Sequence, residues 1–152
     1  MKALSKIAAG VSPSATLAVS ALAKKMKAEG KDVIGFGAGE PDFATPDRIS
    51  YAGVRAICDG KTRYTPAAGM IELRQAICDR AKADYGLEYE TAQAVVASGA
   101  KHTVYIALAA LVDPGDEVIV PAPYWVSYYE MVRLFGGVPV VVNVSEEQGF
   151  QL

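Results

Sequence analysis

The spacing of hydrophobic and polar positions changes near the middle of the chain. In the first half, apolar side chains recur every three or four positions, which predicts amphipathic helices. The predicted helices cover residues 13–29, 46–59 and 70–85. Proline stands at the start of the first two helices and glycine follows the end of all three, as is typical of helix boundaries. An irregular arm is expected at residues 1–12, and a short strand at residues 33–36.

The second half alternates short valine-rich runs with helical segments. Strands are predicted at residues 95–96, 117–120 and 138–144, and helices at residues 98–112 and 127–135. This β-α-β-α-β order predicts an α/β fold with a parallel sheet and right-handed crossovers. In such sheets, ligands bind outside the carboxyl ends of the strands.

A turn of small residues, Ser98, Gly99 and Ala100, joins the first of these strands to its helix. The first amides of a helix have no internal acceptor and carry partial positive charge, so the turn can bind an anion. Lys101 follows in the first turn, where a cation is unfavourable for the helix and indicates a negative partner. The alternative is an ordinary strand-to-helix corner capped by Ser98.

A second glycine-rich segment, residues 35–42, resembles a dinucleotide-binding fingerprint only superficially. Glu40 takes the place of its last glycine, and Pro41 follows where a helix should open. We interpret this segment, which includes Ala38, as backbone that must stay free of side chains because a ligand passes close to it.

Composition narrows the choice of function. The chain has 152 residues, 51% of them hydrophobic, which is enough for one domain of ordinary size. Its net charge of -2 and its lack of charge runs make nucleic acid an unexpected partner. Cys58 and Cys78 fit no metal or disulfide framework, and we expect both to be buried in a reducing compartment. With no signal peptide or membrane span expected, the prediction is a cytoplasmic protein.

Several short motifs, in one order along the chain, resemble those of class I pyridoxal-phosphate-dependent aminotransferases, and in particular the bacterial aspartate aminotransferase branch. The motifs are P-S-A-T at 13–16, G-E-P-D-F at 39–43, Y-T-P-A-A-G at 64–69, S-G-A-K at 98–101, D-P-G-D at 113–116 and P-Y-W at 123–125. Together they extend over almost the whole chain. The resemblance therefore carries more weight than any single motif.

This resemblance implies the amino-terminal portion of a fold-type-I enzyme. Residues 1–46 would form the arm, its helix and a small-domain segment, and residues 47–152 the first, incomplete part of the large cofactor-binding domain. The implied cofactor is pyridoxal 5′-phosphate. Its phosphate would be held by the backbone at Gly99, Ala100 and Lys101, and its ring would lie against Trp125.

The resemblance also implies a shared site and a substrate class. Tyr64 would reach the phosphate bound by a neighbouring subunit, which implies a homodimer. The amide of Gly39 would bind the substrate α-carboxylate beside Trp125. Ser14, Thr16 and Lys101 would recognise the distal carboxylate of aspartate or glutamate, and His102 is interpreted as a surface or packing residue.

The activity implied is transfer of an amino group between an amino acid and a 2-oxo acid. The lysine that forms the resting imine would lie beyond residue 152, so this segment contains no catalytic residue and is expected to be inactive alone. Two alternatives stay open. One is a non-catalytic phosphate-binding or regulatory module on the same scaffold, and the other is a related enzyme such as a carbon-sulfur lyase or an aromatic aminotransferase.

Overall fold

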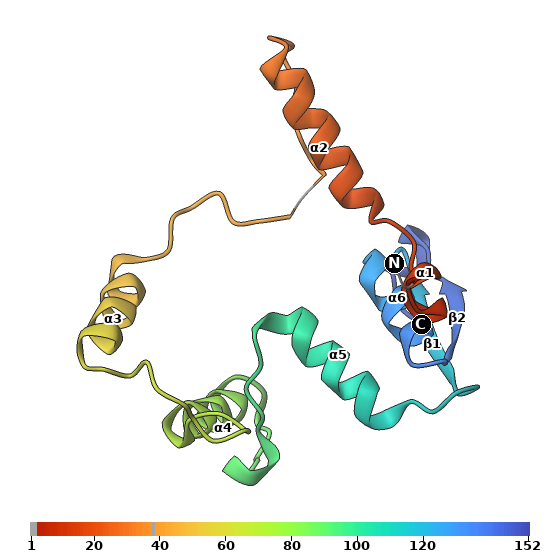
Figure 1. Ribbon diagram of the computed structural model, residues 1–152. Coiled ribbons are helices and arrows are strands. Elements are labelled where there is room, and N and C mark those ends of the chain that lie inside the picture. Colours follow the sequence, from red (N-terminus) through yellow and green to blue (C-terminus); the bar gives the residue numbers. More distant parts are fainter. Residues whose placement is uncertain (1–2, 38) are drawn as a thin grey trace. The chain divides into compact units, whose positions relative to one another are not determined.

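The computed structural model describes residues 3–37 and 39–152 (Figure 1), so Ala38 of the glycine-rich segment lies outside the described residues. The elements are α1 Lys6–Ala9, α2 Ala15–Ala28, α3 Asp47–Cys58, α4 Ile71–Tyr85, η1 Thr91–Gln93, α5 Gly99–Leu111, β1 Glu117–Ala122, α6 Val126–Leu134, β2 Val138–Asn143 and η2 Glu146–Gln148. They form two compact units. Unit 1 comprises Met1–Gly39 with Val104–Leu152, and unit 2 comprises Glu40–Thr103.

The helices predicted from periodicity are confirmed, and their boundary residues explain where they start and stop. Ser14 is the N-cap of α2, and its hydroxyl accepts a hydrogen bond from the Leu17 N–H. Gly86 ends α4 in the left-handed conformation, with φ of 69°. The irregular arm is a partly wrong prediction. The Ser5 hydroxyl accepts the Ala8 N–H at 3.1 Å and starts the four-residue helix α1.

The parallel pairing predicted for the second half is also confirmed. β1 pairs with β2 in parallel, with Glu117 opposite Val138 and Ala122 opposite Asn143. α6 makes the crossover between them, and its Met131 and Val132 are buried. Gly137 comes just before β2, and a side-chain carbon built on it would lie 2.9 Å from a Val132 methyl group. Only glycine therefore lets the backbone pack this closely.

Two predicted strands, at residues 33–36 and 95–96, are not strands in the structure. A strand is defined by ladder hydrogen bonds, and neither segment pairs with β1 or β2, which form the two-stranded sheet of the described residues. Phe36 is 93% exposed. The Val96 N–H donates instead to the Ala68 carbonyl, at 3.0 Å, which ties the segment to a preceding loop.

Unit 2 has a small core between α4 and η1. Cys78 and Ala94 are buried there, and Arg74 Nη1 donates to the Thr91 carbonyl at 3.0 Å. Cys58 is exposed, which corrects the expectation that both cysteines are buried. The reason is that Cys58 ends α3, a helix with no buried residue.

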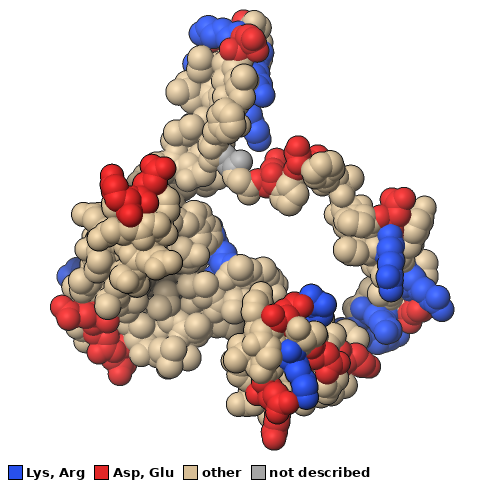
Figure 2. Space-filling view, turned by 180° about the vertical axis from the view of Figure 1, so that it is seen from behind, with Lys and Arg blue, Asp and Glu red and all other residues tan. Residues whose placement is uncertain are grey.

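The surface charges, the helix lengths and the arrangement of possible metal ligands add three observations. Acidic and basic side chains are interspersed over the face seen in Figure 2, without a large field of one sign. Within residues 3–37 and 39–152, no helix combines the length and apolarity that crossing a bilayer requires. The same residues contain no cluster of histidine, cysteine and carboxylate side chains suited to a metal ion.

Candidate cofactor and substrate site

The predicted anion turn lies in unit 2, at the start of α5. Gly99 has φ of 81°, a left-handed conformation that strains any residue with a side chain. A side-chain carbon built on Gly99 would meet nothing within 4 Å, so open space borders the backbone at this position. The turn is thus shaped for a group that approaches the main chain itself.

Local hydrogen bonds hold the turn. The Gly99 N–H donates to the Ala97 carbonyl at 2.9 Å, and the Thr103 hydroxyl donates to the Gly99 carbonyl at 3.3 Å. The Ser98 N–H donates to His102 Nδ1 at 3.3 Å. An accepting Nδ1 places the proton of the neutral imidazole on Nε2. The sequence interpretation missed this role for His102, although its spacing of four residues from Ser98 brings the two together in the first helical turn.

The charges around the turn favour an anion. The first turn of α5 contains no acidic residue and includes the exposed Lys101. A helix N-terminus contributes about 0.3–2 kcal/mol toward an anion. Millimolar binding requires about 4 kcal/mol, so the turn needs contributions from other groups.

The loop that carries Tyr64 is joined to this turn within unit 2. Tyr64 is fully exposed, whereas the far end of its loop, Gly69, packs against Val96. A side-chain carbon on Gly69 would lie 2.7 Å from Val96 Cβ. Because Val96 comes two residues before Ser98, the loop supports the strand-like segment that leads into the turn.

In unit 1, Trp125 is the N-cap residue of α6 and is 39% exposed. Tyr128 lies against it edge-to-face, with ring centroids 5.4 Å apart, and donates its N–H to the Trp125 carbonyl at 3.0 Å. These contacts fix the indole at the start of the helix. Part of its surface remains available for stacking.

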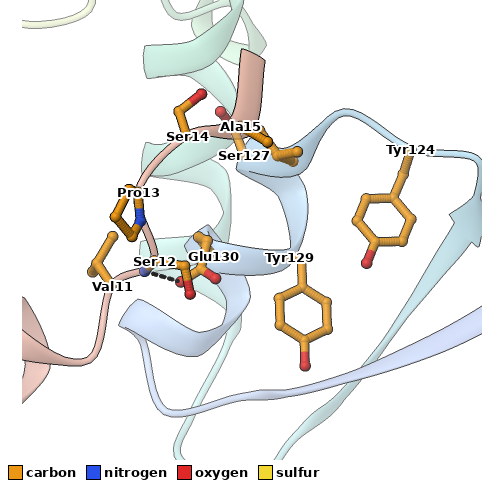
Figure 3. Close-up of a pocket in the computed structure, with 10 residues that line it drawn as sticks. Val11, Ser12, Pro13, Ser14, Ala15, Tyr124, Ser127, Tyr129 and Glu130 are labelled. Atoms are coloured by element: carbon orange, nitrogen blue, oxygen red, sulfur yellow. Dashed lines mark hydrogen bonds between the residues drawn. The ribbon is translucent and has the colours of Figure 1, made fainter. Parts of the chain in front are cut away.

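The other predicted substrate residues also lie in unit 1. Ser14, the N-cap of α2, lines a cavity of about 310 Å³ together with Tyr124, Ser127 and Tyr129 of the α6 region (Figure 3). Thr16 is half-buried in the first turn of the same helix. Gly39 is exposed, and a side-chain carbon there would meet nothing within 4 Å.

Two features, each taken within its own unit, match what the sequence led us to expect: a left-handed turn bordered by open space at the start of α5, and a partly exposed indole at the start of α6. The model of the family "Aminotransferase class I and II" matches residues 31–152. The chain therefore belongs to this family, whose aspartate aminotransferase members depend on pyridoxal phosphate.

Individual relatives narrow the branch. The chain is 53% identical over 152 residues to an aspartate/prephenate aminotransferase of Cereibacter sphaeroides, and 50% identical over 149 residues to an aspartate aminotransferase of Geobacillus stearothermophilus. The match to the Cereibacter protein covers 100% of this chain, and the match to the Geobacillus protein covers 98% of it. This chain spans only 38% of the length of each relative. A solved structure of an aspartate aminotransferase from Thermus thermophilus with maleate is similar to this chain, with a TM-score of 0.93 and 45% sequence identity. The match covers 99% of this chain and 39% of the Thermus chain. These similarities confirm the predicted family branch and fold class.

The residues of the turn fit a phosphate. Open space borders Gly99, the turn supplies helix N-terminal amides, and the first helical turn carries a cation and no acid. The amides at the start of α5 and the charge of Lys101 are of the kind that a phosphate requires, and the Gly99 N–H, donated to the Ala97 carbonyl, fixes the shape of the turn. The roles assigned to the individual site residues stay predictions, namely those of Gly99, Ala100, Lys101, Trp125, Tyr64, Gly39, Ser14 and Thr16.

Proposed function

We propose that this chain is the amino-terminal portion of a pyridoxal-phosphate-dependent aminotransferase that moves an amino group between aspartate or glutamate and a 2-oxo acid. The observation that carries the proposal is the left-handed Gly99 turn, with open space beside it, within the matched family region. We further propose a cytoplasmic homodimer and a boundary at residue 46 between the small-domain segment and the large domain.

Each residue has a binding or shielding role in this proposal. The backbone at Gly99, Ala100 and Lys101 holds the phosphate and fixes the position of the ring. Trp125 covers one face of the ring and excludes water from it. Bound there, pyridoxal phosphate supplies the electron sink that makes the substrate α-proton acidic. The N–H of Gly39 donates to the substrate α-carboxylate and so orients the α-carbon that carries the acidic proton.

A second carboxylate is the chemical feature that we propose for the substrates. Maleate, named with the Thermus structure, is a dicarboxylate, and so is aspartate. Prephenate, named for the Cereibacter relative, also carries two carboxylates and is a 2-oxo acid. We therefore propose prephenate as a second amino acceptor that uses the same distal-carboxylate residues, Ser14, Thr16 and Lys101.

A dimer would explain the full exposure of Tyr64. The Tyr64 side chain does not pack in the core of its own unit, and its loop is held at the far end by the contact between Gly69 and Val96. In the proposed homodimer, Tyr64 extends to the phosphate of the partner subunit. Sedimentation of the full gene product should give twice the monomer mass, and a Tyr64→Phe variant should bind the cofactor more weakly in that dimer.

The decisive experiment uses the protein expressed from its full gene. Purified with pyridoxal phosphate, it should show a visible absorption band that disappears on addition of aspartate and returns on addition of a 2-oxo acid. Oxaloacetate should appear in the same assay. A spectrum that responds to no amino acid would overturn the aminotransferase proposal and favour the non-catalytic module.

Lys101→Ala tests the distal-carboxylate role. We expect the KM for aspartate to rise more than the KM for an aromatic amino acid, because only aspartate loses a charge partner. A charge-assisted hydrogen bond corresponds to at least a tenfold loss, about 1.5–3 kcal/mol. An equal loss for both substrates would remove the assignment.

A further inference from the structure

One acidic side chain, Glu130, links the arm of residues 3–14 to α6. The Ser12 N–H donates a hydrogen bond to Glu130 Oε2 at 3.5 Å. The two residues are 118 positions apart in the sequence, so this bond joins distant parts of the chain. Both belong to unit 1. Figure 3 shows this hydrogen bond beside the cavity that Ser14 lines.

Glu130 is positioned to act as a fixed acceptor. Its side chain is 20% exposed, and both of its oxygens lie 3.4 Å from Arg133 Nη1. The Arg133 guanidinium also lies 5.9 Å from the centre of the Tyr129 ring, which stacks on Tyr124. The carboxylate is thus partly neutralised and has little freedom to turn away from the arm.

The arm contacts this pair from two sides. One cavity, of about 310 Å³, lies between Glu130 and residues 11–15. A second, of about 260 Å³, lies between Glu130, Arg133 and Lys6, Ile7 and Gly10 around α1. Packing between the arm and α6 is therefore loose on both sides, and the long hydrogen bond from the Ser12 N–H to Glu130 is a polar contact that joins the two segments.

The position of α6 makes this contact relevant to the site. Trp125 is the N-cap residue of α6, and Ser14 is the N-cap residue of α2, two residues after Ser12. Glu130 therefore connects the helix that begins at the ring-stacking indole to the segment that carries Ser14 and Thr16.

We propose that Glu130 is a positioning residue that holds the arm so that Ser14 and Thr16 meet the distal carboxylate of the substrate. This inference rests on the proposed function. Arg133 has a second role here, because it neutralises a carboxylate that would otherwise repel a dicarboxylic substrate near Ser14.

The test compares three variants of the full-length, cofactor-loaded enzyme. Glu130→Ala removes the acceptor, Glu130→Gln keeps an acceptor oxygen without the charge, and Glu146→Ala is a control in η2.

Two measurements are made on each variant. Steady-state kinetics are recorded with aspartate and with an aromatic amino acid, and hydrogen exchange is followed in the peptide that covers residues 11–17. Hydrogen exchange reports on the arm whether or not the enzyme transaminates.

Glu130→Ala should raise the KM for aspartate about fivefold, less than the tenfold loss expected for a charged residue that contacts the substrate, because Glu130 acts only through the arm. The kcat and the KM for the aromatic amino acid should change little. Exchange at residues 11–17 should become faster, and Glu130→Gln should restore both readouts toward the parent. If Glu130→Ala fails to fold, Glu130→Met, which has a similar length but no acceptor oxygen, replaces it and should show the same faster exchange. Identical exchange in Glu130→Ala and Glu146→Ala would overturn the inference even if aspartate is transaminated normally. An enzyme that transaminates no amino acid, but shows the exchange change, would overturn only the proposed function.

Discussion

The contact between Gly69 and Val96 gives a sharp test of the structure, because an added methyl group is opposed for two separate reasons. Gly69 has φ of 96°, and a side-chain carbon built there would lie 2.7 Å from both Val96 Cβ and Val96 Cγ2. Neither atom belongs to the flexible end of a long side chain. Gly69→Ala must therefore strain the backbone and also push Val96 away.

The expected loss of stability is the sum of these two contributions. Left-handed backbone costs a residue with a side chain about 1–2 kcal/mol. Forcing an extra carbon into a packed contact typically costs about 1–3 kcal/mol. Gly69→Ala should thus lower the free energy of unfolding by about 2–5 kcal/mol, a large part of the stability of an ordinary domain.

Two other glycines provide matched controls. Gly86 has φ of 69° but open space around it, so Gly86→Ala should cost only the backbone strain, about 1–2 kcal/mol. Gly53 lies inside α3 with open space around it, so Gly53→Ala should stabilise by about 0.5–1 kcal/mol. Urea unfolding of the cofactor-free full-length protein, followed by circular dichroism, would rank the three variants.

A loss for Gly69→Ala no greater than that for Gly86→Ala would refute the packing of the Tyr64 loop on Val96. A functional readout adds to the ranking. Val96 leads into the Ser98 turn, so displacing it should also weaken cofactor binding, whereas Gly86→Ala should leave the dissociation constant of pyridoxal phosphate near that of the parent.

Three further predictions concern single polar contacts. His102→Ala removes the acceptor for the Ser98 N–H and should weaken pyridoxal phosphate binding about threefold, measured by absorbance titration; unchanged affinity would show that the bond does not order the turn. Ser14→Ala removes the α2 cap and should cost about 1 kcal/mol of unfolding free energy. Ser14→Asp should restore that stability but raise the KM for aspartate by charge repulsion, so a KM equal to the parent's would place the distal carboxylate elsewhere. The Ser145 hydroxyl lowers the pKa of the Glu147 carboxyl, so Ser145→Ala should raise that pKa in an NMR titration. Any stability linked to this bond is present above the unfolded-state pKa and is lost as the pH falls through the folded-state pKa.

Features that depend on neighbouring residues were predictable from the sequence. The proline and glycine boundaries placed α2, α3 and α4 within one or two residues of their observed limits. Alternation of apolar runs and helices was enough to predict that β1 and β2 pair in parallel. The Gly99 turn was predicted because small residues before an apolar helix leave its first amides accessible.

Features that depend on distant residues were not predictable in this way. The valine-rich run at residues 95–96 has the composition of a strand, yet a strand also needs a partner, and Val96 bonds to Ala68 instead. Cys58 follows the apolar pattern of its helix, but α3 buries nothing. No local pattern brings Ser12 to Glu130, because that contact depends on how two segments pack in three dimensions.

The chain contains a single tryptophan, Trp125, which makes the start of α6 an optical probe. Indole fluorescence of residues 1–152 comes from one place, beside Tyr128 and partly open to solvent. Emission from this segment therefore reports on its surroundings without labelling. A chromophore stacked on the indole would quench that emission, so if the cofactor ring binds against Trp125 as we propose, its arrival should lower the fluorescence in real time.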